Sequence, residues 1–245
     1  MDGSHLRNAE SSLSCYSIVV KDNETSERGF VKLVQSSLEV DNEFDIERFD
    51  AAIPKDVSKY MREDLAGIQW TWPWQQPERC LATGLTKYPY PTTTPHKRIA
   101  CFISHFLLWK KCLDSDIPIL ILEHDSKFIK KLDMNILNND YDIIGINSPI
   151  GATRKQREYN NIIQTNKPDI VVPVPRIDQF DIPQGLAGNS AYIVKPAGAK
   201  SLIDKVREIG AWPNDALMCY QNIKRLGVST TYYTQVQGLP STTTL

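Results

Sequence analysis

The chain has 245 residues, of which 41% are hydrophobic and 23% are charged, proportions that are ordinary for a globular protein with a sizeable core. Its 28 basic and 29 acidic residues leave a formal net charge of -1, so no global field would draw the chain to nucleic acid or to a membrane surface. The five cysteines are odd in number and lack a CxxC pair, which disfavours a disulfide framework or a structural zinc site.

No segment approaches the roughly 20 consecutive apolar residues that a membrane-spanning helix needs. The N-terminus also lacks the basic and then apolar pattern of a signal peptide. We therefore expect a cytoplasmic protein without an integral membrane segment. Residues 1–14 are polar and aperiodic, and Gly3-Ser4-His5 looks like a vector-derived remnant. We expect a disordered tail or remnant over residues 1–14 and a single domain over residues 15–245.

The first third of the chain indicates a strand, a helix and then a long loop. Residues 16–20 (YSIVV) are β-rich, and a helix after them is marked by Phe30, Val31, Val34 and Leu38. Residues 44–52 allow a short strand, and Pro54 begins an expected helix that runs to Met61. Residues 67–95 are rich in Trp, Pro, Tyr and Thr and lack periodicity. Such a long loop in a compact domain is usually a lid or a binding element.

The clearest pattern lies in the middle of the chain. A helix is predicted over residues 96–113, with an apolar face formed by Ile99, Phe102, Ile103, Phe106 and Leu107. Residues 117–122 (IPILIL) then form a continuous apolar run, which is typical of a strand buried on both faces in a parallel sheet. We expect a short helical segment over residues 128–137 and a further strand over residues 141–146.

The last part of the chain again alternates strands with helices. Residues 147–184 are polar and aperiodic, except for an apolar run over residues 170–174. Beyond them, the pattern predicts a strand over residues 191–194, helices around Leu202, Ile203 and Val206 and over 215–226, and a last strand over 228–236. This alternation predicts an α/β sandwich with a mainly parallel central sheet.

The apolar run of residues 117–122 stops abruptly at Glu123-His124-Asp125. Ligands of an open α/β sheet bind beyond the carboxyl ends of its strands, so this step lies where a crevice is expected. In extended chain, Glu123 and Asp125 would point to one side and His124 to the other. Two carboxylates on one side suit Mn²⁺ or Mg²⁺ shared with substrate phosphates. Taken alone, acidic residues after a strand are more often solvated capping groups.

Two motifs on either side of this strand resemble the family 25 glycosyltransferases. Residues 100–105 (ACFISH), with Trp109 and Lys110 after them, resemble the family's G-C-x-x-S-H helix, and residues 122–128 (LEHDSKF) resemble its L-E-D-D-x-x-F strand end. Weaker matches in the same order occur at residues 26–28, 49–52, 191–194, 198–200 and 241–242. The family includes bacterial lipopolysaccharide and collagen galactosyltransferases. The resemblance implies a GT-A-type, Rossmann-like three-layer sandwich.

Three positions depart from the family pattern. His124 replaces the middle acidic residue, Ala100 replaces the glycine before the cysteine, and Arg98 replaces a usual glutamate. If Glu123 and Asp125 are the ligand pair, His124 replaces an outward residue with little effect. If the middle position ligates the ion directly, metal preference moves toward softer ions or activity is lost.

The resemblance also implies an inverting transfer of a sugar from a UDP-sugar to a hydroxyl acceptor, with Mn²⁺ or Mg²⁺ held by Glu123 and Asp125. The ion would offset charge on the departing diphosphate, and a general base would take the proton of the acceptor hydroxyl. Asp215 resembles an aspartate common in the family and is the candidate base. Its alternative role is the N-capping of a helix.

On the donor side we place Arg28, Ser104, His105 and His124. Ser104 and His105 flank the apolar stripe of the 96–113 helix, from which they would face the donor pocket. Arg28 would approach the nucleotide from the helix that follows the first strand. A structural histidine and a solvated surface arginine are the alternative interpretations of His105 and Arg28.

On the acceptor side we place Trp72, Trp74, Arg154 and Asn189. Trp70, Trp72 and Trp74 alternate, so an extended segment would present three rings on one side as a platform for sugar or base faces. Packing of the loop onto the core explains the same three rings and is the favoured interpretation.

Three functions follow from these patterns. The first is transfer to a glycan or lipopolysaccharide acceptor. A variant is glycosylation of a hydroxymethylated DNA base by a viral enzyme, because the basic Arg154, Lys155 and Arg157 lie beside Tyr159. The third is a non-catalytic nucleotide-sugar-binding protein, motivated by the three departures. A hydrolase or nucleotidyltransferase would lack both a P-loop and a G-x-S-x-G elbow here. The patterns determine neither the donor sugar nor the oligomeric state.

Overall fold

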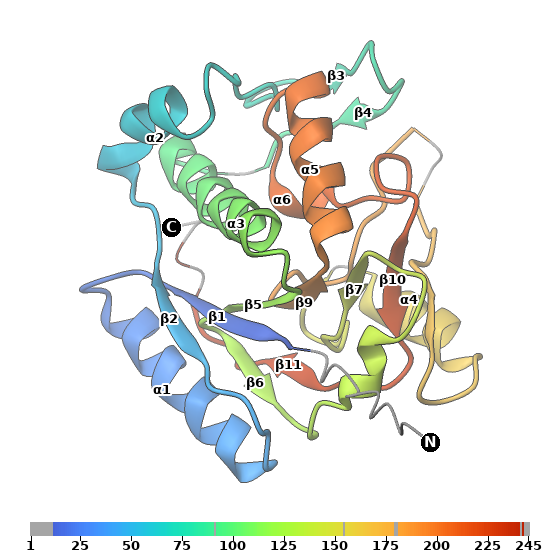
Figure 1. The fold of residues 1–245 in the computed structure, drawn as a ribbon. Helices are drawn as coiled ribbons and strands as arrows, with labels where there is room; N and C mark the ends of the chain where they lie inside the picture. The colour runs from blue at the N-terminus through green and yellow to red at the C-terminus, as the bar shows by residue number, and fades with distance from the viewer. Residues whose placement is uncertain (1–11, 91, 154, 179–180, 241, 243–245) are drawn as a thin grey trace, which may run out of the picture.

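The computed structural model describes residues 12–90, 92–153, 155–178, 181–240 and 242. Within this part of the chain, seven strands form a central sheet of order β2-β1-β5-β9-β7-β10-β8, shown in Figure 1. In chain order they are β1 (Ser14–Val19), β2 (Glu47–Asp50), β5 (Ile119–Glu123), β7 (Ile143–Gly145), β8 (Val171–Pro173), β9 (Ala191–Val194) and β10 (Leu226–Ser229). Only β8 and β9 run antiparallel to their neighbours, so the sheet is mainly parallel.

Helices and a small ribbon cover the two faces of this sheet. The helices are α1 (Glu24–Glu39), α2 (Val57–Glu63), α3 (Pro95–Ser115), α4 (Gln156–Gln164), α5 (Pro196–Ile209) and α6 (Asn214–Leu217), with the 3-10 turns η1 (Pro54–Asp56) and η2 (Met134–Leu137). Helices α3 and α5 lie side by side over one face, and α1 lies over the other (Figure 1). Beside α1, β6 (Ser126–Phe128) pairs with β11 (Thr234–Val236), and a separate hairpin pairs β3 (Glu78–Arg79) with β4 (Thr86–Lys87).

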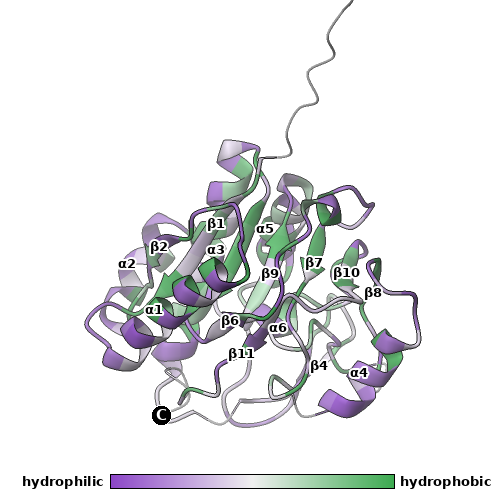
Figure 2. Cartoon of the chain, turned by 90° about the horizontal axis from the view of Figure 1, so that it is seen from below, coloured by the Kyte–Doolittle hydropathy of each residue, from purple (hydrophilic) through white to green (hydrophobic). Residues whose placement is uncertain are grey.

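Strand β5 supplies apolar side chains to both faces of the sheet. Ile119 and Ile121 join the cluster under α3 and α5, whereas Leu120 and Leu122 join the cluster that contains Leu33 of α1. All five side chains are fully buried. Figure 2 accordingly shows hydrophobic strands between helices whose outer sides are hydrophilic. Because both faces are covered, the strand carries a continuous apolar run rather than an alternating one. The predicted three-layer α/β sandwich is confirmed.

Local capping chemistry explains where two helices begin and end. Asn23 accepts a hydrogen bond from the Ser26 backbone N–H at 2.9 Å, which satisfies one of the free donors in the first turn of α1. Helix α3 begins at Pro95 and ends before Asp116, whose φ of 54° is left-handed. Proline suits a first turn because its missing N–H would have no partner there.

Several predicted elements are corrected by the structure. The helical segment expected over residues 128–137 is limited to the 3-10 turn η2, because Phe128 ends β6. The helix expected over residues 215–226 is limited to α6, because the backbone N–H of Tyr220 bonds to Gln184 instead of continuing the helix. The single last strand is two strands in two different sheets, β10 and β11. The tract over residues 147–184 contains α4, which buries Tyr159 and Ile163.

Two further expectations concern the ends and the cysteines. Residues 1–11 of the expected tail lie outside the described residues, and β1 begins at Ser14. All five cysteines lie in the described part of the chain and are free thiols. Of the described helices, none is both long enough and apolar enough to cross a membrane.

We predict that Gly198→Ala destabilises the fold by about 1–3 kcal/mol, as overpacking of a close contact does. A Cβ atom at Gly198 in α5 would lie 2.5 Å from the Asp142 carbonyl oxygen and 2.9 Å from the Ile143 side chain. Asp142 cannot retreat freely, because the same carbonyl accepts a hydrogen bond from Lys195 at 2.8 Å. Urea unfolding followed by circular dichroism measures the change.

Ser201→Ala on the exposed side of α5 is the matched control and should change stability by no more than about 0.5 kcal/mol. Equal stabilities of Gly198→Ala and Ser201→Ala would contradict the close packing of α5 against β7.

Candidate active site

The acidic step lies in a turn that follows β5. Glu123 is the last residue of β5, and His124 and Asp125 form the turn before β6. The Asp125 carbonyl accepts a hydrogen bond from the Gln237 backbone N–H at 2.7 Å, which ties the turn to the C-terminal segment. Because the chain is no longer extended, the expected alternation of side chains does not apply. His124 is only 8% exposed and faces the same cavities as Glu123.

Three cavities adjoin this turn. The central cavity, of about 360 Å³, is lined by Glu123, His124, Asp125, Asn189 and Asp215 among others. The narrow cavity, of about 180 Å³, lies between the end of β1 and α3 and shares Glu123 and His124 with the central one. The wide cavity, of about 720 Å³, shares Asp215 with the central one. The acidic turn thus joins the narrow and central cavities, and Asp215 joins the central and wide cavities.

The two carboxylates of the turn differ in their electrostatics. Burial alone would raise the pKa of Glu123, but the hydrogen bond from His105 and nearby positive charge such as that of Arg98 lower this pKa below its ordinary value. Burial, followed by the negative charge of Glu123, raises the pKa of Asp125 to about 7. Within the described residues, Asp125 Oδ1 is buried without a hydrogen-bond partner. A bound cation would relieve both the repulsion and the missing partner.

Asn189, which also lines the central cavity, carries further buried polar atoms without a hydrogen-bond partner among the described residues. Its side chain is 7% exposed, and neither Oδ1 nor Nδ2 has a hydrogen-bond partner among the described residues. Buried amides are normally satisfied, so Asn189 points to a polar ligand here. Glu123 and Asp125 thus line one cavity with oxygens of the kind that Mn²⁺ or Mg²⁺ prefers, and Asn189 lies on the same wall.

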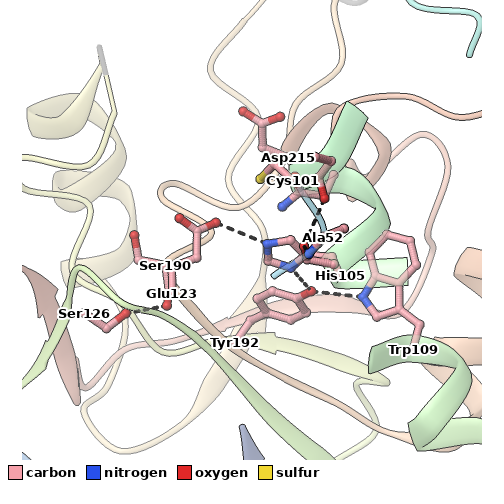
Figure 3. Close-up of polar contacts among 12 residues, drawn as sticks. Ala52, Cys101, His105, Trp109, Glu123, Ser126, Ser190, Tyr192 and Asp215 are labelled. Carbon is pink, nitrogen blue, oxygen red and sulfur yellow. Dashed lines mark hydrogen bonds and ion pairs between the residues drawn. The ribbon is translucent and has the colours of Figure 1, made fainter. Parts of the chain in front are cut away.

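Ser104 and His105, both on α3, line the narrow cavity but are engaged by the protein itself. The Ser104 hydroxyl donates to the Ala100 carbonyl at 2.9 Å and accepts from the Ala52 backbone N–H at 3.0 Å. His105 is 1% exposed, and its ring lies between Glu123 and Tyr192, as Figure 3 shows. The predicted contact of Ser104 and His105 with a donor stays a prediction.

Cys101, His105 and Glu123 place their potential ligand atoms within 4.8 Å of one another. Two observations disfavour a metal ion at this cluster. His105 Nε2 is already hydrogen-bonded to Glu123 Oε1 at 3.2 Å. Burial, and then the charge of Glu123, raises the pKa of Cys101 well above its ordinary value, so forming the thiolate that a metal ion needs is unfavourable here.

Asp215 lies at the second position of α6 and is accessible to solvent from the cavities. Pro213 is the residue at the N-cap, so Asp215 is not an N-cap residue. Tyr90 donates a hydrogen bond to Asp215 Oδ2 at 2.9 Å, and the Ala216 backbone N–H donates to Oδ1 at 3.0 Å. Desolvation by the cavity walls raises the pKa of Asp215, against the opposite effects of Tyr90 and Arg98.

The tryptophans pack rather than form a platform. Trp72 is 5% exposed and meets Trp212 edge-on at 5.2 Å, although its edge still lines the wide cavity. Trp74 stacks on Trp70 at 5.2 Å and lines none of the three cavities. An extended segment cannot bring the first and third rings into such contact, so the chain bends at this point. The favoured packing interpretation agrees with these contacts.

Neither of the other two predicted cationic residues is found at the cavities, because one lies away from them and the other is outside the described residues. Arg28 is 60% exposed on α1, 3.9 Å from Glu24, and lines none of the three cavities. Arg154 lies outside the described residues. Its neighbour Lys155 lines the wide cavity and bonds to Asp178 at 3.0 Å and to the Ile177 carbonyl at 2.7 Å. Roles for Arg28 and Arg154 therefore stay predictions.

The sequence patterns missed Tyr90 and Tyr192, which contact Asp215 and His105 respectively. Tyr90 lies in the loop over residues 67–95, whose composition indicates a binding element without marking any one side chain. Tyr192 lies in a strand whose apolar pattern hides a polar contact. Only the tertiary structure brings either hydroxyl to the site.

Comparisons with known proteins complete the description of this site. The model of "Glycosyltransferase family 25 (LPS biosynthesis protein)" matches residues 28–218, which is more than three quarters of the chain. No curated protein sequence matches. Two solved structures are similar at low levels. The first, an active-site mutant of LgtC, has 12% identity and a TM-score of 0.41, with 88% of this chain and 71% of that chain covered.

The second solved structure is apo mouse xyloside xylosyltransferase 1, with 11% identity and a TM-score of 0.40, and with 86% of this chain and 80% of that chain covered. The family match includes the acidic turn, His105 on α3 and Asp215 on α6. On the strength of that match, this chain belongs to glycosyltransferase family 25 and is a glycosyltransferase.

Proposed function

We propose that this glycosyltransferase moves a sugar from a UDP-sugar to a hydroxyl of a glycan, such as a lipopolysaccharide, with inversion and with the help of Mn²⁺ or Mg²⁺. The observation that carries the proposal is the order of the cavities. The carboxylates of Glu123 and Asp125 lie at the central cavity, and Asp215 lies between the central and wide cavities. The free cysteines suit a reducing cytoplasm.

The narrow and central cavities suit a nucleoside diphosphate. Ile18, Ala51 and Ile53 line the narrow cavity with apolar surface against which a base can pack. Lys97 and Arg98, in the first turn of α3, line the narrow and central cavities respectively. Their charges and the positive end of the α3 dipole favour an anion at this place. Arg98, a departure from the family pattern, thereby adds a positive charge near the proposed diphosphate.

Glu123 and Asp125 would hold the divalent ion at the central cavity. When bound, such an ion supplies Lewis-acid stabilisation of the departing diphosphate. The protein's own part is to keep two carboxylates at the cavity, where Glu123 is ionised and Asp125 Oδ1 has no hydrogen-bond partner among the described residues. Asn189 is better placed for the sugar or diphosphate of the donor than for the acceptor, because it lines the central cavity rather than the wide one.

Asp215 is the proposed general base. An inverting displacement needs a base on the side of the sugar that faces away from the leaving group. Asp215 satisfies this requirement if the acceptor enters from the wide cavity, whose wall includes Trp72, Tyr88 and Tyr90. Aromatic faces suit packing against sugar rings. Tyr90 fixes the Asp215 carboxylate through Oδ2, and desolvation raises its pKa toward the range of an effective base.

The two alternative functions gain no support from the site. The DNA-base variant depends on the basic loop, but Lys155 is already paired with Asp178. A non-catalytic binding protein has no need of a buried carboxylate oxygen such as Asp125 Oδ1, which has no partner in the described part of the chain. Transfer to a glycan therefore remains the proposal that accounts for the three carboxylates that line the central cavity.

Asp215→Asn is expected to lower kcat by a factor of about 10² to 10⁴, because it removes a proton acceptor while an amide oxygen can still accept from Tyr90. The measurement is turnover of UDP-sugars with Mn²⁺ and a glycan acceptor. Calorimetry of UDP with Mn²⁺ should show unchanged affinity in the same variant.

Asp204→Asn, on the exposed surface of α5, is the matched control and should keep full turnover. Turnover by Asp215→Asn equal to that of the control would exclude Asp215 as the base. Absence of turnover in the unsubstituted protein with every UDP-sugar, together with UDP binding that is indifferent to Mn²⁺, would overturn the transferase proposal in favour of the binding protein.

The affinity for Mn²⁺ is expected to fall by about tenfold between pH 8 and pH 6, because a proton and the ion compete for Asp125. The pKa of Asp125 is raised in the folded chain from 3.8 to about 7. Without an ion, the folded state therefore binds an extra proton between these two values, and the free energy of unfolding falls as pH rises through that window. Calorimetry and urea unfolding at several pH values measure the two effects.

Asp125→Asn should abolish Mn²⁺ binding and flatten the fall in stability between pH 4 and pH 7. Asp45→Asn, at an exposed position away from the cavities, should leave both unchanged. An unaltered pH profile in Asp125→Asn would contradict the assignment of the raised pKa to this residue.

A further inference from the structure

A continuous chain of hydrogen bonds runs from the core to the acidic turn. Trp109 Nε1 lies 2.9 Å from Tyr192 Oη, Tyr192 Oη lies 2.8 Å from His105 Nδ1, and His105 Nε2 lies 3.2 Å from Glu123 Oε1. Trp109 and Tyr192 are fully buried, His105 is 1% exposed, and the Glu123 side chain is 28% exposed. Figure 3 shows the four side chains in this order.

The chemistry of the four groups allows one direction for the hydrogens. An indole N–H only donates, so Trp109 donates to the Tyr192 oxygen. Tyr192 then uses its own hydrogen to donate to His105 Nδ1, and His105 carries its hydrogen on Nε2 and donates to the Glu123 carboxylate. In the opposite histidine tautomer, or in the doubly protonated ring, the Tyr192 hydrogen would have no acceptor among the described residues. A buried hydroxyl without an acceptor is unfavourable by about 1–3 kcal/mol.

We propose that Trp109, Tyr192 and His105 are positioning residues that hold the Glu123 carboxylate in place for the metal ion and the donor, with His105 in the neutral Nε2–H tautomer. The effect on binding of the metal ion and the donor rests on the proposed function. The chain of hydrogen bonds itself does not depend on that function. It also gives His105 a different role from direct contact with the donor. The ring orients a carboxylate that would otherwise rotate at the junction of the narrow and central cavities.

Packing supports the same assignment. The His105 and Tyr192 rings are stacked with an interplanar angle of 14° and centroids 5.8 Å apart, so neither ring can turn without displacing the other. Trp109 in turn meets Phe102 and Phe106 within the α3 core. The carboxylate is thereby tied through three buried side chains to the hydrophobic cluster under α3 and α5. Such outer partners of metal ligands orient them and strengthen ion binding.

The test compares Tyr192→Phe with the unsubstituted protein. Tyr192→Phe keeps the ring and its packing but removes the hydroxyl that links Trp109 to His105. The affinity for Mn²⁺ in the presence of UDP, measured by calorimetry, should weaken by about 10- to 100-fold, as losses of outer partners of metal ligands do. Tyr232→Phe is the matched control, because it removes a tyrosine hydroxyl that bonds to Asn160 at 3.1 Å away from the three cavities. Its Mn²⁺ affinity should not change.

Substitution of His105 supplies a rescue experiment. His105→Gln keeps an N–H donor toward Glu123 and an oxygen acceptor toward Tyr192, whereas His105→Leu keeps neither. The Gln variant should therefore bind Mn²⁺ more tightly than the Leu variant. Equal affinities of the two folded variants would overturn the positioning role, because loss of packing alone does not distinguish them.

Nitrogen NMR of His105 tests the hydrogen-bond chain without any catalysis. The neutral Nε2–H tautomer should be present in the unsubstituted protein, and it should persist when Mg²⁺ is added. A neutral Nδ1–H tautomer, either before or after addition of Mg²⁺, would overturn the proposal, because Nε2 would then be an acceptor or a metal ligand. If the unsubstituted protein neither binds Mn²⁺ nor turns over a donor, the proposed function is wrong. The NMR result then still shows whether His105 donates a hydrogen bond to Glu123.

Discussion

The burial of β5 on both faces is the constraint on which the rest of the site depends. A strand covered on both sides has to be apolar along its length, so Ile119, Leu120, Ile121 and Leu122 pass through the centre of the molecule without a polar side chain. Charged groups can appear only where the covering helices end. Glu123 stands at that boundary as the last residue of β5, which is paired with a strand on each side. The fold therefore delivers a carboxylate to a cavity with little freedom in its backbone.

Two neighbouring carboxylates at this boundary, those of Glu123 and Asp125, differ in their pKa values. Glu123 receives a hydrogen bond from His105 and stays ionised, while Asp125 is desolvated beside that charge and has a pKa of about 7. A pair of titratable groups whose environments push their pKa values apart is a common sign of a functional site. In this chain the two pKa values differ because the two carboxylates have different surroundings. The turn that carries Asp125 is in turn held by Gln237 of the C-terminal segment.

Sequence patterns predicted much of the fold and part of the site. The stripe on α3, the run in β5 and the strand β9 were predicted within a few residues, because each is a long or strongly apolar element whose periodicity is local. Residues 128–137 and 215–226 were predicted wrongly, because backbone pairing with distant segments replaces the helix there. The prediction that His124 points away from Glu123 and Asp125 was wrong for a related reason. Alternation along a strand holds only while the chain stays extended, and a turn begins at His124.

By itself, the sequence determined where the acidic residues stand, which helix precedes them and which family they resemble, because all three depend on residue type and on short spacing. Tertiary structure decided what those residues meet. It placed Asp215 at the same cavity as the acidic turn, buried His105 between Tyr192 and Glu123, and packed Trp72 against Trp212. Contacts of this kind join residues far apart in the chain, and they depend on how sheet and helices pack together. No local pattern encodes them.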